Sequence, residues 1–568
     1  MDNNTERIAK PFRTLEELYS KLDNLEPWPE VCELRESAEY VYSGQEICLG
    51  DNFENLSKFN RDKQPKTIVC HDLKGGYLED RFIDGSSAQD SYTFYHWSII
   101  DIFIYFSHYT ITIPPYGWIH TAHKHGVKVL GTVITERTDG EKVWEQVLSS
   151  MEETKKFADA LIMVAKYYKF EGWLLNIENK INHNDIDQLK YFVQYLTYGI
   201  HSEIDNAEII WYDSVTTDGS LLWQNKLNDR NKDFFENCDG IFLNYNWTDA
   251  GLLESRSIAE CTNRTTDIYV GLDVWGRGCP GGGGFNSIEA LKKIRDCDLS
   301  VAIFAPGWTH EYFNGQKFEL IENIFWAQLV PFMYIHVPIY DNETFVTTFC
   351  RGYGEKYFYN GESDETSLPF YNLAWQEPQI SVPNYQLQFT HVNIVEAKKD
   401  NKENDKKDLP VCTYETLFHK IIAQGSKIHI EDKPEQKSFN CIQFFTKYSY
   451  NGGGCIKLNV NRPEYHRLFL IHLEHNTDIQ VIIIHRTDEY NNIQDDNNQD
   501  NYPVLIIKNN TMTKRLEPYG NFGLNSQWKQ SYYRSTSMKT INELGVIFTS
   551  AGSYCLGKIQ IQQMPMII

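Results

Sequence analysis

The sequence contains no apolar run that approaches the roughly 18 residues of a membrane-spanning helix, so no membrane partner is indicated. Its 12 cysteines include no CxxC pair, so neither a zinc site nor a redox motif is indicated. Basic residues are in deficit: the formal net charge is −23 and the pI is near 5.2. Such an acidic chain is a poor match for nucleic acid or for an anionic membrane surface.

The N-terminal residues MDNNTERIAKPFRTLEEL lack a basic segment followed by an apolar one, so we expect no secretory signal peptide. The scattered cysteines are expected to be reduced and mostly buried. The sequon Asn246-Trp247-Thr248 lies at the end of a predicted core strand, where a glycan could not be accommodated. These features predict a cytoplasmic protein, and they do not indicate its oligomeric state.

What the sequence does contain is a regular alternation of apolar strands and amphipathic helices. Helical patterns with apolar residues at i, i+3 and i+4 lie between several strands, as at 140–168 and 185–200. Continuous apolar strands separated by helices indicate a parallel sheet covered on both faces. The apolar, β-branched runs occupy residues 66–73, 100–108, 127–136, 172–179, 208–214, 240–247, 268–278 and 300–308.

Eight such units over roughly 250 residues predict an α/β fold of the (β/α)8 TIM barrel type. A doubly wound sheet is the alternative, but no GxGxxG follows the first strand. The Gly-rich stretch CPGGGGF (279–285) lacks the Lys-Ser/Thr of a phosphate cradle and is predicted to be a flexible loop.

The length of 568 residues exceeds one ordinary core and predicts two or three domains. Residues 1–60, with one predicted helix at TLEELYSKLD, are expected to form an extension that packs on the barrel of residues 61–380. Residues 381–568 alternate short strands with turns and are expected to form an accessory C-terminal β-sandwich region of one or two domains. Two polar stretches there, 396–408 and 487–501, are predicted surface loops.

Polar and aromatic residues gather where the barrel strands end, in the clusters HDLKGGY, YFSHY, TVITE, NIEN, WYDS, NYNW, DVWGRG and PGWTHE. The carboxyl ends of all barrel strands meet at one face, which is where active sites lie. Asp72 and Asn244 belong to these clusters and are candidate substrate contacts. Tryptophans suit the apolar faces of sugar rings, and the candidates here are Trp211, Trp247, Trp275 and Trp308, with Trp223 in a loop.

The fourth strand, EGWLLNIEN, carries the most specific signal. Strand periodicity places Leu174, Asn176 and Glu178 on one face and Leu175 and Ile177 on the other. A carboxylic acid in an apolar, aromatic cleft has a raised pKa and can protonate a glycosidic oxygen. Most glycosidases need a second carboxylate as well. The polar neighbour of Glu178 along this strand, about 7 Å away, is instead the amide of Asn176.

An amide cannot act as nucleophile or base, but it can hydrogen-bond another amide. We therefore expect a substrate that supplies its own nucleophile, the 2-acetamido group of an N-acetylglucosamine, whose carbonyl oxygen attacks the anomeric carbon to give an oxazoline. Asn176 would orient the acetamide. Glu178 would donate a proton to the leaving sugar and then accept one from water, with retention of configuration.

No cofactor and no metal site is predicted for this chemistry. The pair His71-Asp72 and the group His120, His123 and His125 lack convincing metal-ligand spacing. We interpret these histidines as capping or surface residues.

The strand-four sequence EGWLLNIEN resembles that of the cytosolic endo-β-N-acetylglucosaminidases (the ENGase type) of glycoside hydrolase family eighty-five. Further similar stretches span residues 66–380 and are VCHDLKGGYLEDRF, IIWYDSVTTDGSLLWQNKLND, IFLNYNW, VGLDVWGRG, TTFCRGYG and FYNLAWQEPQ. The resemblance implies a barrel followed by β-sandwich domains. It also implies cleavage between the two core N-acetylglucosamine residues of N-linked glycans, on glycopeptides or free oligosaccharides. Glu171 stands where the family pattern leads us to expect Asp.

By the same resemblance, Asn176 and Glu178 take the catalytic roles described above, Tyr212 contacts the acetamide or oxazoline, and Trp223 and Trp247 line the acceptor side. Transglycosylation is expected as a side activity, since a sugar hydroxyl can replace water at the oxazoline. Three alternatives stay open: a structural Asn176–Glu178 pair, a chitinase-like glycosidase, and a glycan-binding protein without catalysis, including a lectin that uses the sandwich. The chitinase alternative lacks the DxxDxDxE pattern that strand four would carry.

Overall fold

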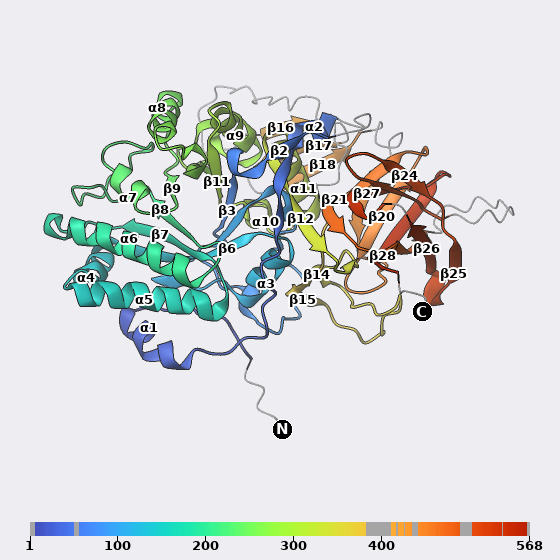
Figure 1. Cartoon of the computed structure of the whole chain (residues 1–568), viewed down its shortest axis with the longest axis horizontal. Coiled ribbons are helices and arrows are strands. Elements are labelled where there is room, and N and C mark those ends of the chain that lie inside the picture. Colours follow the sequence, from blue (N-terminus) through green and yellow to red (C-terminus); the bar gives the residue numbers. More distant parts are fainter. Residues whose placement is uncertain are drawn as a thin grey trace, which may run out of the picture.

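The computed structural model describes residues 6–49, 56–381, 411–415, 419–424, 427–433, 441–488, 502–536 and 538–564. Parallel strands in the first part of the chain form a closed barrel (Figure 1). Strand β4 pairs with both β3 and β6, and β11 pairs with both β10 and β3, which closes the ring. The strands are β3 (Thr67–His71), β4 (Ile102–Tyr105), β6 (Lys128–Glu136), β7 (Gly172–Glu178), β8 (Glu208–Tyr212), β9 (Gly240–Leu243), β10 (Ile268–Asp273) and β11 (Ser300–Phe304).

All eight strands fall within the predicted apolar runs, so the predicted (β/α)8 fold is confirmed. The helical pattern at 140–168 gives two helices, because Ser150 caps the second by accepting a hydrogen bond from Glu153 N at 3.2 Å. The predicted N-terminal helix is α1 (Leu15–Lys21). The helices around the barrel are α3 (Tyr116–Lys124), α4 (Arg137–Val147), α5 (Met151–Tyr168), α6 (Ile186–Glu203), α7 (Lys232–Glu236), α8 (Asp249–Glu260), α9 (Ser287–Asp296), α10 (Trp308–Glu311) and α11 (Phe318–Leu329).

The two faces of β7 separate as its periodicity predicts. Leu174 packs with Ile134, Tyr212 and Phe242 in the cluster that fills the barrel interior. Leu175 and Ile177 instead belong to the larger core between the barrel and its helices. Asn176 and Glu178 share the face of Leu174 and therefore point inward, at the carboxyl end of the barrel.

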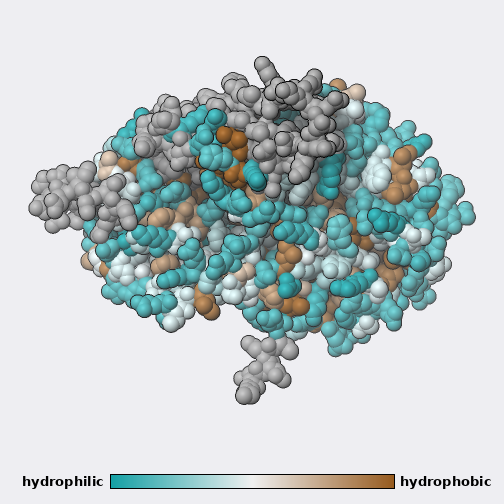
Figure 2. All heavy atoms as spheres, turned by 180° about the vertical axis from the view of Figure 1, so that it is seen from behind, coloured by the Kyte–Doolittle hydropathy of each residue, from teal (hydrophilic) through white to brown (hydrophobic). Residues whose placement is uncertain are grey.

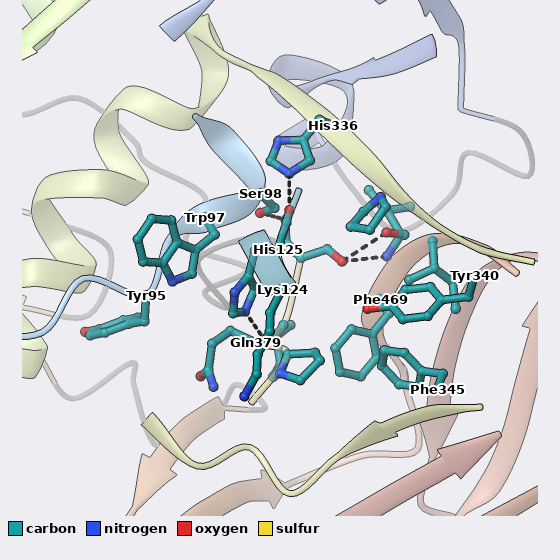
Figure 3. Close-up of a pocket in the computed structure, with 16 residues that line it drawn as sticks. Tyr95, Trp97, Ser98, Lys124, His125, His336, Tyr340, Phe345, Gln379 and Phe469 are labelled. Atoms are coloured by element: carbon teal, nitrogen blue, oxygen red, sulfur yellow. Dashed lines mark hydrogen bonds between the residues drawn. The ribbon is translucent and has the colours of Figure 1, made fainter. Parts of the chain in front are cut away.

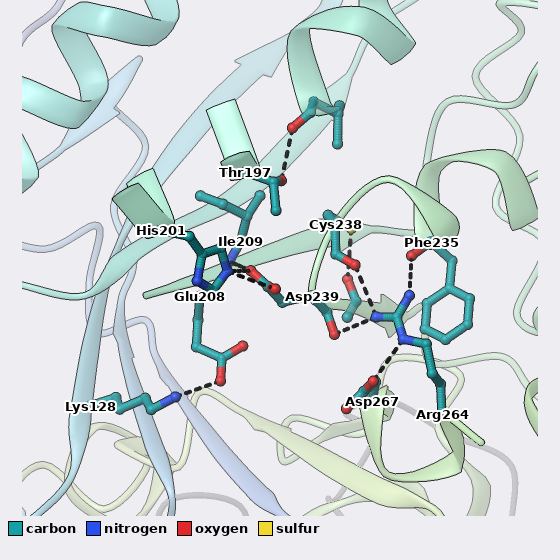
Figure 4. A network of polar contacts seen from close by, with 12 residues as sticks. Lys128, Thr197, His201, Glu208, Ile209, Phe235, Cys238, Asp239, Arg264 and Asp267 are labelled. Atoms are coloured by element: carbon teal, nitrogen blue, oxygen red, sulfur yellow. Dashed lines mark hydrogen bonds and ion pairs between the residues drawn. The ribbon is translucent and has the colours of Figure 1, made fainter. Parts of the chain in front are cut away.

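The opposite end of the barrel is held by the polar network of Figure 4. Asp239 accepts a hydrogen bond from Ile209 N at 2.7 Å and lies 2.9 Å from His201 Nε2. Arg264 pairs with Asp267 at 2.8 Å and donates to the carbonyl oxygens of Phe235, Cys238 and Asp239. These contacts join the starts of β8, β9 and β10. They lie away from the carboxyl ends of the strands, so they stabilise the barrel and take no part in its chemistry.

Three histidines that we interpreted as capping or surface residues are buried instead. His71 stacks on Tyr92 with ring centroids 5.1 Å apart, and His125 lies against the sandwich. His123 on α3 contacts Glu171 through Nε2 and Oε1 at 3.0 Å, and Glu171 also accepts from Val129 N at 2.7 Å. The Glu in place of the expected Asp supplies an extra methylene in a side chain that reaches both partners.

Most of the other described strands form a β-sandwich of two sheets that share one core. The first sheet runs β2 (Lys58–Asn60), β1 (Ser37–Ser43), β12 (Tyr334–Asp341), β21 (Tyr465–Glu474), β27 (Thr540–Ile547), β23 (Val504–Lys508) and β24 (Thr513–Leu516). The second runs β19 (Cys441–Phe445), β20 (Cys455–Val460), β28 (Gly552–Gln563), β22 (Ile479–Thr487), β26 (Lys529–Ser535) and β25 (Gly520–Gly523), with β13 (Phe345–Thr347) on β28.

The sheets cross both predicted domain limits. Strands β1 and β2 come from the N-terminal extension, and β12 and β13 come from the segment assigned to the barrel. The division at residues 60 and 380 stays a prediction. The predicted strands of residues 382–397, the loop 396–408 and most of the loop 487–501 lie outside the described residues.

Two smaller sheets complete the fold. Strands β16 (Val411–Glu415), β17 (His419–Gln424) and β18 (Lys427–Asp432) form an antiparallel sheet, and β14 (Arg351–Gly354) pairs with β15 (Phe370–Gln376). Gln376 at the end of β15 is buried and donates to Phe94 O and Arg351 O at 3.1 and 3.2 Å. This hairpin therefore joins the barrel segment to the strands that lead into the sandwich.

Barrel and sandwich meet at the small pocket of Figure 3. His336 Nε2 donates to His125 O at 2.8 Å, and Gln379 N donates to His125 Nε2 at 3.3 Å. Burial lowers the pKa of His125 to about 3 and that of His336 to about 4. Both rings are neutral at physiological pH, which suits a junction packed by Phe345 and Phe469.

The surface agrees with the acidic, polar composition. Figure 2 shows a predominantly hydrophilic face, with hydrophobic residues in separate patches. Within the described ranges, no helix is long and apolar enough to cross a membrane.

Candidate active site

Asn176 and Glu178 lie at the carboxyl end of β7, on the inward face of the barrel. Asn176 is buried, and its Nδ2 makes no well-formed hydrogen bond within the described part of the chain. Glu178 is half-buried. A buried amide donor that is poorly satisfied is costly unless a ligand completes its hydrogen bonding, so this geometry prepares Asn176 to bind a hydrogen-bond acceptor.

The Glu178 carboxyl has a pKa above its ordinary value. Burial is the main cause, and the charge of Glu136 adds to it. Hydrogen bonding by Trp223 and Asn176, together with the nearby His108, opposes the shift. A group of this kind holds its proton to higher pH than an ordinary glutamate, as a general acid requires.

Trp223 lies in the loop after β8, with 40% of its surface exposed. Its indole Nε1 donates to Glu178 Oε1 at 3.4 Å. The tryptophan therefore contacts the carboxylate with its polar edge and still offers ring surface to a ligand.

The sequence WYDS at the end of β8 supplies two of the contacts that order the site. The Tyr212 hydroxyl donates to Asn244 Oδ1 at 2.9 Å, and burial, with the Glu178 charge, raises the pKa of Tyr212 well above its ordinary value. Ser214 Oγ donates to Ile177 O at 2.7 Å, between Asn176 and Glu178. Tyr212, Asn244 and Ser214 thus tie together the ends of three neighbouring barrel strands.

A charged cavity opens at the same face of the barrel and is lined by Asp72, Lys74, Gly75, His108, Trp275, Arg277 and Glu311. His108 Nε2 lies 4.0 Å from Asp72 Oδ2. Burial raises the pKa of Asp72, while His108 and Arg277 oppose the shift. Because His108 also acts on the pKa of Glu178, the cavity lies near the acid. The structure thus brings Asp72 and Trp275 to the mouth of the barrel, meaning the cavity at the carboxyl ends of its strands.

Trp275 and Arg277 are held at this cavity by Asp273, the last residue of β10. The Asp273 carboxylate accepts from Trp275 N at 3.1 Å and from Arg277 Nε at 2.7 Å. Trp275 is 37% exposed.

The structure does not bring the other strand-end tryptophans to the mouth. Trp247 is 3% exposed and donates from Nε1 to Gly271 O at 2.8 Å. Trp308 is 8% exposed and stacks on Tyr312 with centroids 5.3 Å apart. Trp211 stacks on Phe234 in the core. Placing Trp247 on the acceptor side stays a prediction, which would require the enclosing residues to move.

Several residues of the site were not singled out from the sequence. Glu136 ends β6 in register with Glu178, so two carboxylates end neighbouring strands. His108 lowers the pKa of Glu178, Asp213 accepts a hydrogen bond from Asn225 N, and Asn225 Oδ1 accepts one from Asn244. Glu136, His108 and Asp213 lie in the strand-end clusters, which was the available signal. The clusters alone do not show which strand ends lie side by side, because that depends on how the strands pair.

Metal ligation has no support among the described residues, since they contain no group of three or more His, Cys, Asp or Glu arranged to hold an ion.

Comparison with known proteins gives concordant matches. Residues 77–357 match the family model described as glycosyl hydrolase family 85. The chain is 42% identical over 375 residues to cytosolic endo-beta-N-acetylglucosaminidase of Danio rerio, covering 66% of this chain and 50% of that protein. It is 43% identical over 318 residues to the Homo sapiens protein of the same name, covering 56% and 42%. The Arabidopsis thaliana cytosolic endo-beta-N-acetylglucosaminidase 1 is 38% identical over 373 residues, covering 66% and 52%.

The chain thus spans about half the length of the curated relatives it matches. Among solved structures, the glycoside hydrolase domain of Endo-D from Streptococcus pneumoniae aligns with a TM-score of 0.71 at 17% identity, covering 98% of this chain and 83% of that one. At that identity the match supports the barrel-plus-sandwich fold alone.

Proposed function

Since the chain belongs to glycosyl hydrolase family 85, we propose that it is an endo-β-N-acetylglucosaminidase acting on N-glycans. It hydrolyses the β-1,4 bond between the two core N-acetylglucosamine residues and leaves one of them on the peptide or protein. The names of the curated relatives support this activity. Its substrates are N-linked glycans on glycopeptides or proteins, and free oligosaccharides with the same core.

The observation that carries the proposed mechanism is the pairing of Glu178 with Asn176. Glu178 has a raised pKa and donates its proton to the leaving sugar oxygen. The substrate acetamide oxygen attacks the anomeric carbon and forms an oxazoline, which water then opens with net retention. Asn176, whose buried Nδ2 makes no well-formed hydrogen bond, holds the acetamide in the attacking orientation.

Tyr212 acts as a neutral hydroxyl beside this reaction. Its raised pKa keeps the proton on oxygen. The hydrogen bond from the Tyr212 hydroxyl to Asn244 Oδ1, at 2.9 Å, fixes the direction in which that proton points. We propose that the Tyr212 hydroxyl contacts the acetamide or oxazoline. A sugar hydroxyl that replaces water at the oxazoline gives transglycosylation.

A second candidate mechanism follows from the in-register position of Glu136 beside Glu178. Two neighbouring carboxylates are the machinery of an ordinary retaining glycosidase, in which one is a covalent nucleophile. Glu136 is exposed at the strand end, whereas Asn176 is enclosed beside the acid, and this favours acetamide assistance.

The proposed location is the cytosol. The relatives are named cytosolic enzymes, and the ten cysteines whose side chains the structure describes are free thiols. Unpaired, mostly buried thiols are typical of a reducing compartment.

The activity is tested by incubating the protein with a defined N-glycopeptide and analysing the peptide by mass spectrometry. A single N-acetylglucosamine left on the peptide is the expected product. Glu178→Gln, which keeps the shape but cannot supply the proton, is expected to lower turnover by about 10³-fold or more. A bare Asn or Asp would indicate a different cleavage, and an unchanged peptide would favour a glycan-binding protein.

The mechanism is tested with Asn176→Ala on two substrates. Hydrolysis of the glycopeptide is expected to be lost, whereas a preformed sugar oxazoline is still turned over because it bypasses the step that Asn176 assists. Equal loss on both substrates would make Asn176 a structural residue.

A further inference from the structure

We propose that Asp213 is a positioning residue of this active site, whose carboxylate fixes the loop of residues 222–225 and so aligns Trp223 with Glu178 and Asn244 with Tyr212. The inference rests on the proposed function, because it concerns the same site. Asp213 is 1% exposed and too enclosed to touch a substrate.

The Asp213 carboxylate is saturated with donors from that loop and its surroundings. Oδ1 accepts from Gln224 N at 3.2 Å and from Asn231 Nδ2 at 3.0 Å. Oδ2 accepts from Asn225 N at 2.7 Å and, at a longer 3.4 Å, from Asn244 N. Backbone N–H groups from the residue after β9 and from the loop after β8 thus converge on one side chain.

Trp223 is bracketed by these bonds. On one side Leu222 N donates to Ser214 O at 2.9 Å, and on the other Gln224 N donates to Asp213. Trp223 is 40% exposed and so only partly held by packing, which leaves its backbone anchors to determine where the indole Nε1 meets Glu178. Without the carboxylate, the anchor on one side is lost.

A second branch leads to Tyr212. Asn225 Oδ1 accepts from Asn244 Nδ2 at 2.7 Å and from Asn246 N at 3.0 Å. Asn244 Oδ1 then accepts the Tyr212 hydroxyl proton. The bond from Asn225 N to Asp213 therefore orients an amide chain that ends on the tyrosine.

The charge of Asp213 is suited to this task. Burial raises its pKa to about 6, with Asn231 and the backbone donors opposing, so the group is ionised at neutral pH. Hydrogen bonds to an ionised acceptor are roughly twice as strong as neutral ones. An asparagine here would turn one of the acceptors into a donor aimed at N–H groups.

The test compares Asp213→Asn with Asp239→Asn on the N-glycopeptide. Asp239 is another mostly enclosed carboxylate beside a barrel strand, accepting from Ile209 N and His201 at the opposite end of the barrel. We expect Asp213→Asn to lower kcat/KM by about 100-fold through misplacement. We expect Asp239→Asn to lower thermal stability and leave kcat/KM and its pH profile as in the wild type.

The pH profile separates positioning from general damage. Glu136, His108, Asn176, Tyr212 and Trp223 surround Glu178. Asp213→Asn is expected to weaken both the Trp223 contact and the Asn244–Tyr212 bond, and of these only the Trp223 contact is a hydrogen bond to the Glu178 carboxylate. Loss of that donor raises the pKa of Glu178, so the basic limb of kcat/KM moves to higher pH, as it does in Trp223→Phe. The double variant Asp213→Asn/Trp223→Phe is expected to have about the same kcat/KM as the less active of the two single variants, because both changes act through the same contact.

If Asp213→Asn does not fold, Asn225→Gly tests the tyrosine branch with the Asp213 carboxylate kept, and it also removes the Asn225 Nδ2 bond to Trp223 O at 3.3 Å. Asn225 has a φ of 55°, which glycine accepts, and the Asp213 bonds to backbone N–H groups stay in place. We expect a loss of roughly fivefold with an unmoved basic limb. Wild-type activity in Asn225→Gly, or a profile of Asp213→Asn that matches Asp239→Asn, would overturn the inference. An inactive wild-type protein would overturn the proposed function beneath it.

Discussion

At the scale of single residues, the environment of Glu178 decides whether it can act as an acid. Its proton is retained by burial and by the charge of Glu136, which lies in register on the neighbouring strand. Trp223 works in the opposite sense by donating to the carboxylate. Glu136 and Trp223 therefore adjust the same pKa in opposite directions.

Glu136→Gln is expected to move the basic limb of kcat/KM to lower pH, because the removed charge raised the pKa of Glu178. At acidic pH the activity is expected to fall by no more than about fivefold, since interactions between exposed charges are worth about 1 kcal/mol or less. A pH series of initial rates on the N-glycopeptide measures both quantities.

The same variant separates the two mechanisms. If Glu136 were a covalent nucleophile, its removal would cost about 10³-fold or more at every pH. Glu136→Asp serves as the control that keeps the charge, and its basic limb should stay near that of the wild type.

Single residues also mark the limit of what the sequence could predict. The inward direction of Asn176 and Glu178 followed from the period of two along β7, because both residues lie within the strand. Trp247 and Trp308 lie beyond the ends of their strands, where that period no longer applies, and both turn into the core. Trp223 and Trp275 remain exposed because carboxylates hold the backbone of their loops.

At the scale of elements, α3, the start of β7 and the N-terminal extension meet at His123, whose partner Glu171 directly precedes β7. Its Nε2 contacts Glu171 Oε1 at 3.0 Å, and its Nδ1 lies 2.7 Å from Cys32 O. Burial alone would lower the pKa of His123, but the Glu171 carboxylate and the Cys32 carbonyl raise it above the ordinary value of 6.5. The charged pair therefore links three segments that are distant in sequence.

His123→Gln is expected to cost about 1–3 kcal/mol of stability at pH 6, because one charge-assisted bond becomes a neutral one. A histidine with a raised folded pKa stabilises fully below its unfolded pKa and loses that contribution as pH rises through the folded value. The difference in Tm between wild type and variant should thus be largest near pH 6 and shrink toward pH 9. His201→Gln, at an exposed site, is the control. A difference that grows with pH would mean that His123 is neutral in the fold.

At the scale of the whole molecule, the barrel followed from the sequence because its strands and helices alternate locally. Which strands make up the sandwich could not be predicted in the same way. Strand β1 pairs with β12 across about 300 residues of chain, and β13 pairs with β28 across about 200. Alternation marks a strand, but nothing within residues 37–43 specifies which distant edge it joins. The predicted N-terminal extension is therefore an edge of the sandwich sheet as well as a neighbour of the barrel.

Deleting residues 1–60 tests this arrangement. The deletion removes β1 and β2, uncovers the edge of β12, and takes Leu15, Leu18 and Val41 from the cores. Burial of three such side chains is worth about 5 kcal/mol or more. We therefore expect a lower Tm, and self-association through the open strand edge, measured by thermal unfolding and light scattering. Deleting residues 1–5 is the control. A monomer with an unchanged Tm would mean that the extension adds no stability to either part.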